Sequence, residues 1–184
     1  MKITPLIAPL LLALSFGIQA AEKAPDSVQK LVPTLKSWGQ NSALIAAVKG
    51  QNAQGITLDQ IKAQDKSWRA ATGVNGFMKG LLSNSGAKEL IKLESSAPYY
   101  MEIFLMDNQG ANVSMTNKTS DYWQGDEAKF TKSFVGGSGA VHMGDVEFDE
   151  SVQAYLVQVS VPVVENGKAI GAITVGVNID ELEK

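Results

Sequence analysis

The sequence predicts an α+β fold in which helices come first and a mainly antiparallel five-stranded sheet follows. Apolar residues recur at helical spacing up to about residue 95 and alternate with polar residues from Tyr99 onward. Asp107–Gly110 and Asn166–Gly167 are typical of the tight turns that join antiparallel strands. A run of helices followed by a run of hairpin-connected strands is the order of an α+β fold.

Length and composition favour one domain with a sizeable core. The chain has 184 residues, of which 45% are hydrophobic, and a formal net charge of −3. The charge is mildly acidic and well mixed, which argues against binding to a polyanion, so no nucleic-acid partner is expected. The chain contains no cysteine, which excludes disulfides, thiolate metal sites and cysteine nucleophiles.

Residues 1–20 have the features of an export signal. Lys2 precedes an apolar run over Ile3–Ile18, and Ala20 ends a small-residue cleavage site. The alternative is a transmembrane anchor, but the run contains two prolines and is shorter than the roughly 20 residues that span a bilayer. We therefore expect a signal peptide over 1–20, a single domain over 21–184, a periplasmic location and no membrane insertion of the mature chain.

The helical half begins with a long N-terminal helix. Asp26 can cap it, Pro33 is expected to kink or restart it, and the Gly50–Gly55 segment ends it. Thr57 and Gln60 then form a capping box at the start of the next helix. Shorter helical segments follow before the strands begin.

Five strands make up the second half, and a short helix at Glu127–Phe134 is inserted between the second and the third. Pro162 cannot donate a ladder hydrogen bond, so the fourth strand must be an edge or bulged at that point. The expected strands are Tyr99–Met106, Ala111–Thr116, Val141–Phe148, Tyr155–Val163 and Lys168–Val177.

The segment between the second strand and the inserted helix is the candidate recognition element. It places Tyr122 and Trp123 beside Asp121, where a plain loop requires neither aromatic residue. An aromatic face attracts a cation, and a carboxylate supplies the counter-charge, so the combination suits an amine. The alternative interpretation is that Trp123 fills the core while Asp121 caps the connection.

The order of elements resembles the extracytoplasmic Cache sensor domains, also called PDC domains, which have a PAS-like fold. The resemblance covers residues 28–182 and implies a five-stranded, mainly antiparallel sheet with a long N-terminal helix and short helices packed on it. It also implies a small-molecule pocket beneath the connection after the second strand. Besides the N-terminal helix, the resemblance rests on Phe104–Gly110, Ser120–Trp123, Phe148–Ser151, Val161–Val163 and Ala169–Ala172.

The resemblance extends to the ligand positions of the amino-acid-binding branch of the family. Trp123 and Asp149 match two of them, whereas Asp121 stands where that branch has arginine and Gln124 where it has an aromatic residue. These departures favour an amine over a free carboxylate. Asp149 has an alternative role, which is to initiate a turn with the residue two positions later. The residues expected to contact ligand are Asp121, Tyr122, Trp123, Asp149 and Tyr155.

Other chemistries find little support in the sequence. The acidic segments lack EF-hand spacing, so a solvated surface is the better interpretation, and His142 is the only histidine. No set of nucleophile, base and acid stands out. We expect no catalytic residues, no metal, no cofactor and no enzymatic activity.

The function expected from these observations is that of an exported sensor-type module. It binds a small polar ligand, amine or amino-acid-like, and signals through a separate membrane receptor partner. The alternative is a structural or protein-interaction domain whose pocket is filled by its own side chains.

We predict cleavage after Ala20, so that the exported chain begins at Ala21, because the apolar run ends at a small-residue site. Mass spectrometry of the protein recovered from its native host measures the first residue. A membrane-bound form that retains Met1 would contradict this prediction.

Overall fold

The computed structural model describes residues 22–150 and 152–184, so the predicted signal peptide lies outside the described residues. The helices are α1 Asp26–Gln29, α2 Val32–Trp38, α3 Ser42–Asn52, α4 Leu58–Ala70, α5 Gly76–Ser83, α6 Ser85–Glu94, α7 Ala128–Phe134 and α8 Ile179–Leu182, with a 3₁₀ turn at Val135–Gly137. The strands are β1 Tyr100–Met106, β2 Asn112–Met115, β3 His142–Asp149, β4 Ala154–Glu165 and β5 Lys168–Asn178.

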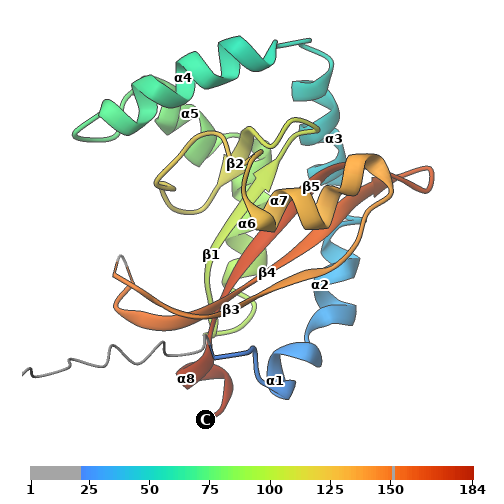
Figure 1. Ribbon diagram of the computed structural model, residues 1–184, viewed down its shortest axis with the longest axis vertical. Coiled ribbons are helices and arrows are strands. Elements are labelled where there is room, and N and C mark those ends of the chain that lie inside the picture. Colours follow the sequence, from blue (N-terminus) through green and yellow to red (C-terminus); the bar gives the residue numbers. More distant parts are fainter. Residues whose placement is uncertain (1–21, 151) are drawn as a thin grey trace, which may run out of the picture.

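The five strands form one sheet in the order β2-β1-β5-β4-β3, and every neighbouring pair is antiparallel (Figure 1). This confirms the predicted α+β class and five-stranded sheet. Pairing of β3 with β4 ends at His142 opposite Ser160, so Pro162 lies on a stretch of β4 beyond the last pair. The register of β4 against β5 also shifts between Val163 and Val164. Pro162 therefore occupies the edge-like, bulged position that its missing N–H requires.

The predicted long N-terminal helix is divided into α1, α2 and α3. Pro33 lies in the first turn of α2, where a missing N–H costs nothing. A second break follows α2 at Gly39, which lies so close to β4 that a Cβ there would be 2.1 Å from the carbonyl oxygen of Pro162. The chain restarts at Asn41, whose Oδ1 accepts a hydrogen bond from the N–H of Ala43 at 2.9 Å.

The two faces of the sheet are covered by different elements (Figure 1). On one face, α2, α3 and α6 pack on alternate residues of β1, β4 and β5 to form the main core. On the other face, α4, α5 and α7 cover Phe104 and Met106, which belong to a second core. The fully buried apolar residues of the main core include Leu35, Leu44, Val48, Leu90, Leu105, Val157, Val159, Val161, Val163, Ile173, Val175 and Val177.

The capping box predicted at the start of α4 is present. Thr57 Oγ1 accepts from the N–H of Gln60 at 3.3 Å, and Gln60 Oε1 accepts from the N–H of Thr57 at 2.9 Å. In the described part of the chain, no helix combines the length and the apolar character needed to cross a membrane. Helix α4 lies at one end of the molecule, where it meets the segment that links β2 to α7 (Figure 1).

Candidate ligand-binding cleft

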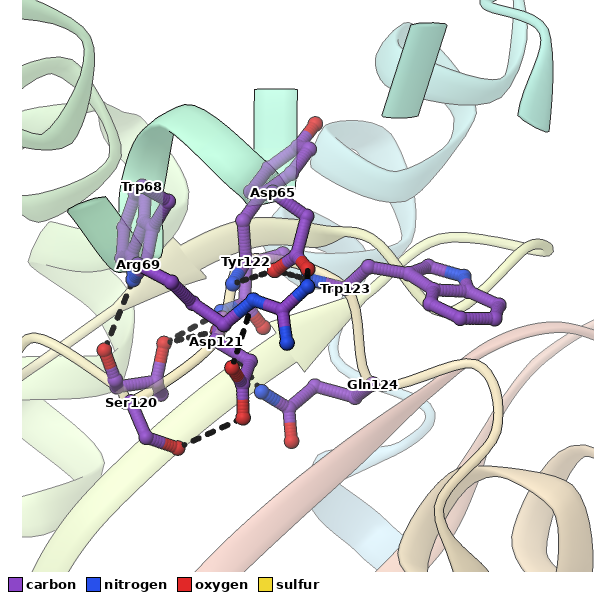
Figure 2. Close-up of polar contacts among 10 residues, drawn as sticks. Asp65, Trp68, Arg69, Ser120, Asp121, Tyr122, Trp123 and Gln124 are labelled. Atoms are coloured by element: carbon purple, nitrogen blue, oxygen red, sulfur yellow. Dashed lines mark hydrogen bonds and ion pairs between the residues drawn. The ribbon is translucent and has the colours of Figure 1, made fainter. Parts of the chain in front are cut away.

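Residues 116–127, here called the connector, are held in place by a buried carboxylate of α4. Asp65 is only 4% exposed. Its Oδ1 accepts hydrogen bonds from the N–H groups of Tyr122 at 2.9 Å and Trp123 at 3.1 Å. Its Oδ2 pairs with Arg69 Nη2 at 2.9 Å. Figure 2 shows Asp65 between α4 and the connector, with Arg69 reaching across it toward Asp121.

Trp123, predicted to offer its aromatic face to a ligand cation, already has partners within the chain. Its Nε1 donates to the carbonyl of Gln109 at 2.8 Å, and Lys62 Nζ lies 4.6 Å from the centroid of its ring. Asp121 likewise has a cation beside it, since Arg69 Nε lies 3.5 Å from Asp121 Oδ1. The cation for the aromatic face and the counter-charge for the carboxylate therefore both come from α4.

Tyr122 points into the second core. Its ring lies 5.8 Å from that of Trp68 and 5.2 Å from that of Phe77, measured between centroids. Burial raises the pKa of Tyr122 to about 12. Trp68 in turn donates from Nε1 to the carbonyl of Thr119 at 2.9 Å. Tyr122 and Asp121 thus dock the connector on α4.

A polar cleft opens on the sheet face beneath the connector and α7. It consists of two hollows of about 440 Å³ and 250 Å³. Lys129, Phe148, Asp149 and Gln158 line both hollows, which therefore adjoin. Residues of β1 and the connector line the larger hollow, and residues of β3 line the smaller one. The combined space is of the size that small-molecule sites offer.

The floor of the cleft is a row of residues in register across three strands. Glu102 of β1 lies opposite Gly176 of β5, which lies opposite Gln158 of β4. Gln158 Nε2 donates to Glu102 Oε1 at 3.0 Å across the glycine. A Cβ on Gly176 would lie 2.7 Å from Glu102 Cγ, so a larger residue there would push Glu102 aside. The row places one carboxylate on the sheet surface, partly shielded from solvent.

Burial raises the pKa of the Glu102 carboxyl. The hydrogen bond from Gln158 and the charge of Lys129 oppose that shift, while the charge of Asp149 adds to it. Within the described part of the chain, the residues that line the cleft carry six carboxyl groups against two ammonium groups. The carboxyl groups belong to Glu102, Glu127, Asp145, Glu147, Asp149 and Glu150, and the ammonium groups to Lys118 and Lys129. This potential favours a cation.

The structure divides the five predicted ligand contacts among separate places. Asp149 lines the cleft, and its Oδ1 also accepts from the N–H of Val152 at 3.4 Å, while its predicted turn partner at position 151 lies outside the described residues. Asp121 and Trp123 line a different hollow, on the outer side of the connector against α4. Tyr122 lines a third hollow beneath α4 and α5. Tyr155 is 52% exposed and packs its ring on Phe148 at 5.2 Å between centroids.

Sequence reasoning missed Glu102 and Gln158. A local signal existed for the first, because Glu102 is the single charged residue of the apolar strand Tyr100–Met106. No local signal joins Glu102 to Gln158, since their meeting depends on the register of β5 between them. Among residues 22–150 and 152–184, no group of three or more potential protein ligands is arranged to hold a metal ion.

The chain is similar to three solved sensor or ligand-binding domains. The sensor domain of the V. cholerae histidine kinase DctB matches 86% of this chain with 15% identity and a TM-score of 0.47. The ligand-binding domain of the Pseudomonas aeruginosa amino acid chemoreceptor PctC, in complex with GABA, matches 84% with 9% identity and a TM-score of 0.43. The sensory domain of the Campylobacter jejuni chemoreceptor Tlp3, with isoleucine bound, matches 85% with 11% identity and a TM-score of 0.35.

The chain spans 51% to 63% of the length of these three domains. They are sensor domains of histidine kinases and chemoreceptors, the class that the sequence was predicted to resemble. No protein-family model and no curated protein matches the sequence.

We predict that Asp65→Ala destabilises the fold by about 3 kcal/mol, because it leaves two buried backbone N–H groups without their charged acceptor. The control is Asp59→Ala, which removes a carboxylate from an exposed position in the first turn of the same helix and is expected to cost less than about 1 kcal/mol. Urea denaturation measures both. Equal small losses would contradict a docking role for Asp65.

Proposed function

We propose that this chain is an exported, non-enzymatic sensor-type module that binds a small amine-bearing polar molecule in the cleft beneath the connector. The observation that supports it most directly is the Glu102 carboxylate on the floor of the cleft, held at a fixed position by Gln158 at 3.0 Å. A partly buried carboxylate without a full counter-ion gains from an ammonium group, which supplies both charge and hydrogen-bond donors.

The wall of the cleft supports the same ligand class. Asp149 lies at the cleft, and its charge acts on Glu102, so two carboxylates converge on the same space. Phe104 contributes an aromatic face to the larger hollow. Carboxylates beside an aromatic face form a typical ammonium site. A dicarboxylic acid would instead meet like charge on the floor and on the wall.

We propose a binding role rather than a catalytic one, because the carboxylates and the aromatic face around the cleft suit recognition of a cation. We propose that the predicted signal peptide over 1–20 directs the domain over 21–184 to the periplasm. There it would report occupancy of the cleft to a separate membrane receptor.

Three four-carbon compounds test the ligand class: putrescine, γ-aminobutyrate and succinate. We expect binding in the order putrescine, γ-aminobutyrate, succinate, with Glu102→Gln weakening putrescine by roughly thirtyfold, since losing one partner of a partly buried charge pair costs about 2 kcal/mol, the low end of the range for buried pairs. Calorimetry measures each affinity. If succinate binds most tightly, or if Glu102→Gln binds putrescine as the wild type does, the proposed site is wrong.

A matched control is Glu94→Gln. Glu94 is a second partly buried glutamate whose pKa is raised by burial and, to a lesser degree, by the charge of Glu102, but it accepts from Thr116 Oγ1 and lies outside the cleft. This variant should bind putrescine within about twofold of wild type. Because ionising Glu102 in the folded state is disfavoured by burial, Glu102→Gln should also be at least as stable as wild type at pH 7, which separates lost binding from lost folding.

Putrescine affinity should fall as the pH is lowered, starting above the range in which an ordinary glutamate titrates. Burial raises the pKa of Glu102, so its carboxylate gains a proton earlier than an exposed one and loses its attraction for the ammonium group. Putrescine itself keeps its charge over this range. Calorimetry from roughly pH 7.5 down to pH 5 in wild type and Glu102→Gln measures the effect. A pH dependence as steep in the variant as in the wild type would assign it to another group.

A further inference from the structure

The cleft already holds an ammonium group, that of Lys129 in the first turn of α7. Lys129 Nζ lies 3.0 Å from Glu127 Oε2 and 5.5 Å from the centroid of the Phe104 ring. Its side chain is only 20% exposed, and it lines both hollows of the cleft. A carboxylate on one side and an aromatic face on the other are the partners that an ammonium ligand would seek.

The other lysine that lines the cleft is placed differently. Lys118 Nζ lies 5.7 Å from the centroid of the Trp68 ring in α4, and the residue is exposed. Lys129, by contrast, approaches the floor closely enough for its charge to act on Glu102. Of these two lysines, Lys129 is therefore the one that shares the space of the proposed amine site in the cleft.

From this placement we infer that the Lys129 ammonium group is a tethered occupant of the amine subsite, which a ligand ammonium must displace from between Glu127 and Phe104. The inference rests on the proposed function and deepens it. Lys129 then sets the selectivity of the cleft. A ligand whose only favourable group is one ammonium merely replaces the contacts that Lys129 already makes, so a ligand must make further contacts in order to displace Lys129. A diamine meets that requirement better than a monoamine of equal length.

Displacement of Lys129 also links ligand occupancy of the cleft to the position of helix α7. Lys129 lies one residue after the start of the helix, and Glu127, its ion-pair partner, directly precedes that start. A ligand that takes over the contacts of Lys129 therefore changes what holds the first turn of α7 over the sheet. Helix α7 packs on β3, β4 and β5, so a shift of that turn reaches the strands that form the floor.

The test compares putrescine binding to Lys129→Met and Lys132→Met. Both variants remove one positive charge from α7, but Lys132 is exposed and lies outside the residues that line the cleft. We expect Lys129→Met to bind putrescine roughly fivefold to tenfold tighter than wild type, the scale of one cation–π contact and one ion pair, and Lys132→Met within about twofold. Lys129→Arg, which keeps the charge, should not gain affinity.

The outcomes separate this inference from the proposed function. If the wild type binds putrescine and Lys129→Met binds it no more tightly, the inference is overturned and the proposed function stands. If Lys129→Met loses γ-aminobutyrate while putrescine is unchanged, Lys129 contacts a ligand carboxylate, and the inference is again overturned. Binding by Lys129→Met but not by wild type supports the inference and overturns ligand binding by the wild-type chain. If no form binds any probe, both are overturned.

A second measurement follows the Lys129 side chain directly and requires no substitution in the hydrophobic core. Reductive ¹³C-methylation of the lysines gives one NMR signal per side chain, and Lys129→Arg identifies the signal of Lys129 by its loss. We expect the ring of Phe104 to shift that signal away from the signals of exposed lysines, and putrescine to return it toward them. A Lys129 signal that coincides with those of exposed lysines, or that putrescine leaves in place, would overturn the displacement.

Discussion

The contact between Asp65 and the connector determines where the rest of the site can be. A carboxylate that is 4% exposed must be fully partnered, and here its partners are two consecutive backbone N–H groups and Arg69. The connector is further pressed against the β1–β2 turn, since a Cβ on Gly110 would lie 2.5 Å from the Cα of Gly125. With its path fixed at both places, the connector forms a wall above the sheet.

The two faces of the sheet divide stability from chemistry. The main core uses one face, where side chains from β1, β4 and β5 are apolar and fully buried against α2, α3 and α6. On the opposite face, α4, α5 and α7 cover only part of the strands, and the uncovered part carries the polar row of Glu102 and Gln158. Alternation along each strand makes this division possible, because successive residues face opposite sides of the sheet. A polar substitution on the cleft side is therefore isolated from the main core.

The sequence predicts those parts of the fold that depend on local signals. The capping box of Thr57 and Gln60, the two hairpin turns and the period of the strands are each contained within a few residues, and each is present in the structure. The break after α2 was not predicted; it lies at Gly39, which packs against Pro162, more than a hundred residues away. Pro33 predicts only the first of the two breaks, the one between α1 and α2.

The candidate site was less predictable than the fold for the same reason. The composition of the connector suggested that Asp121, Tyr122 and Trp123 contact a ligand, but composition cannot say whether the partners of such side chains are a ligand or the rest of the chain. The partners that the structure supplies, Asp65 and Arg69, are more than fifty residues away in the sequence. Asp149 reaches the cleft because it lies at the end of β3, on the same sheet face as Glu102 and Gln158. The alternation of side chains along a strand suggests which face Asp149 occupies.

The sequence left two functional hypotheses open: a ligand-binding module and a domain with a self-filled pocket. The placement of Lys129 is compatible with both. Lys129 fills the amine subsite with a group of the chain itself, yet a lysine side chain is long and flexible, and this one is held by a partly exposed ion pair with Glu127 and a contact with the ring of Phe104. Such an occupant loses little free energy on release, since the ammonium group regains hydration and rotamer freedom. A cleft that holds its own lysine ammonium group stays filled in the absence of ligand. The free energy needed to displace Lys129 is small enough for a cation with stronger contacts to supply.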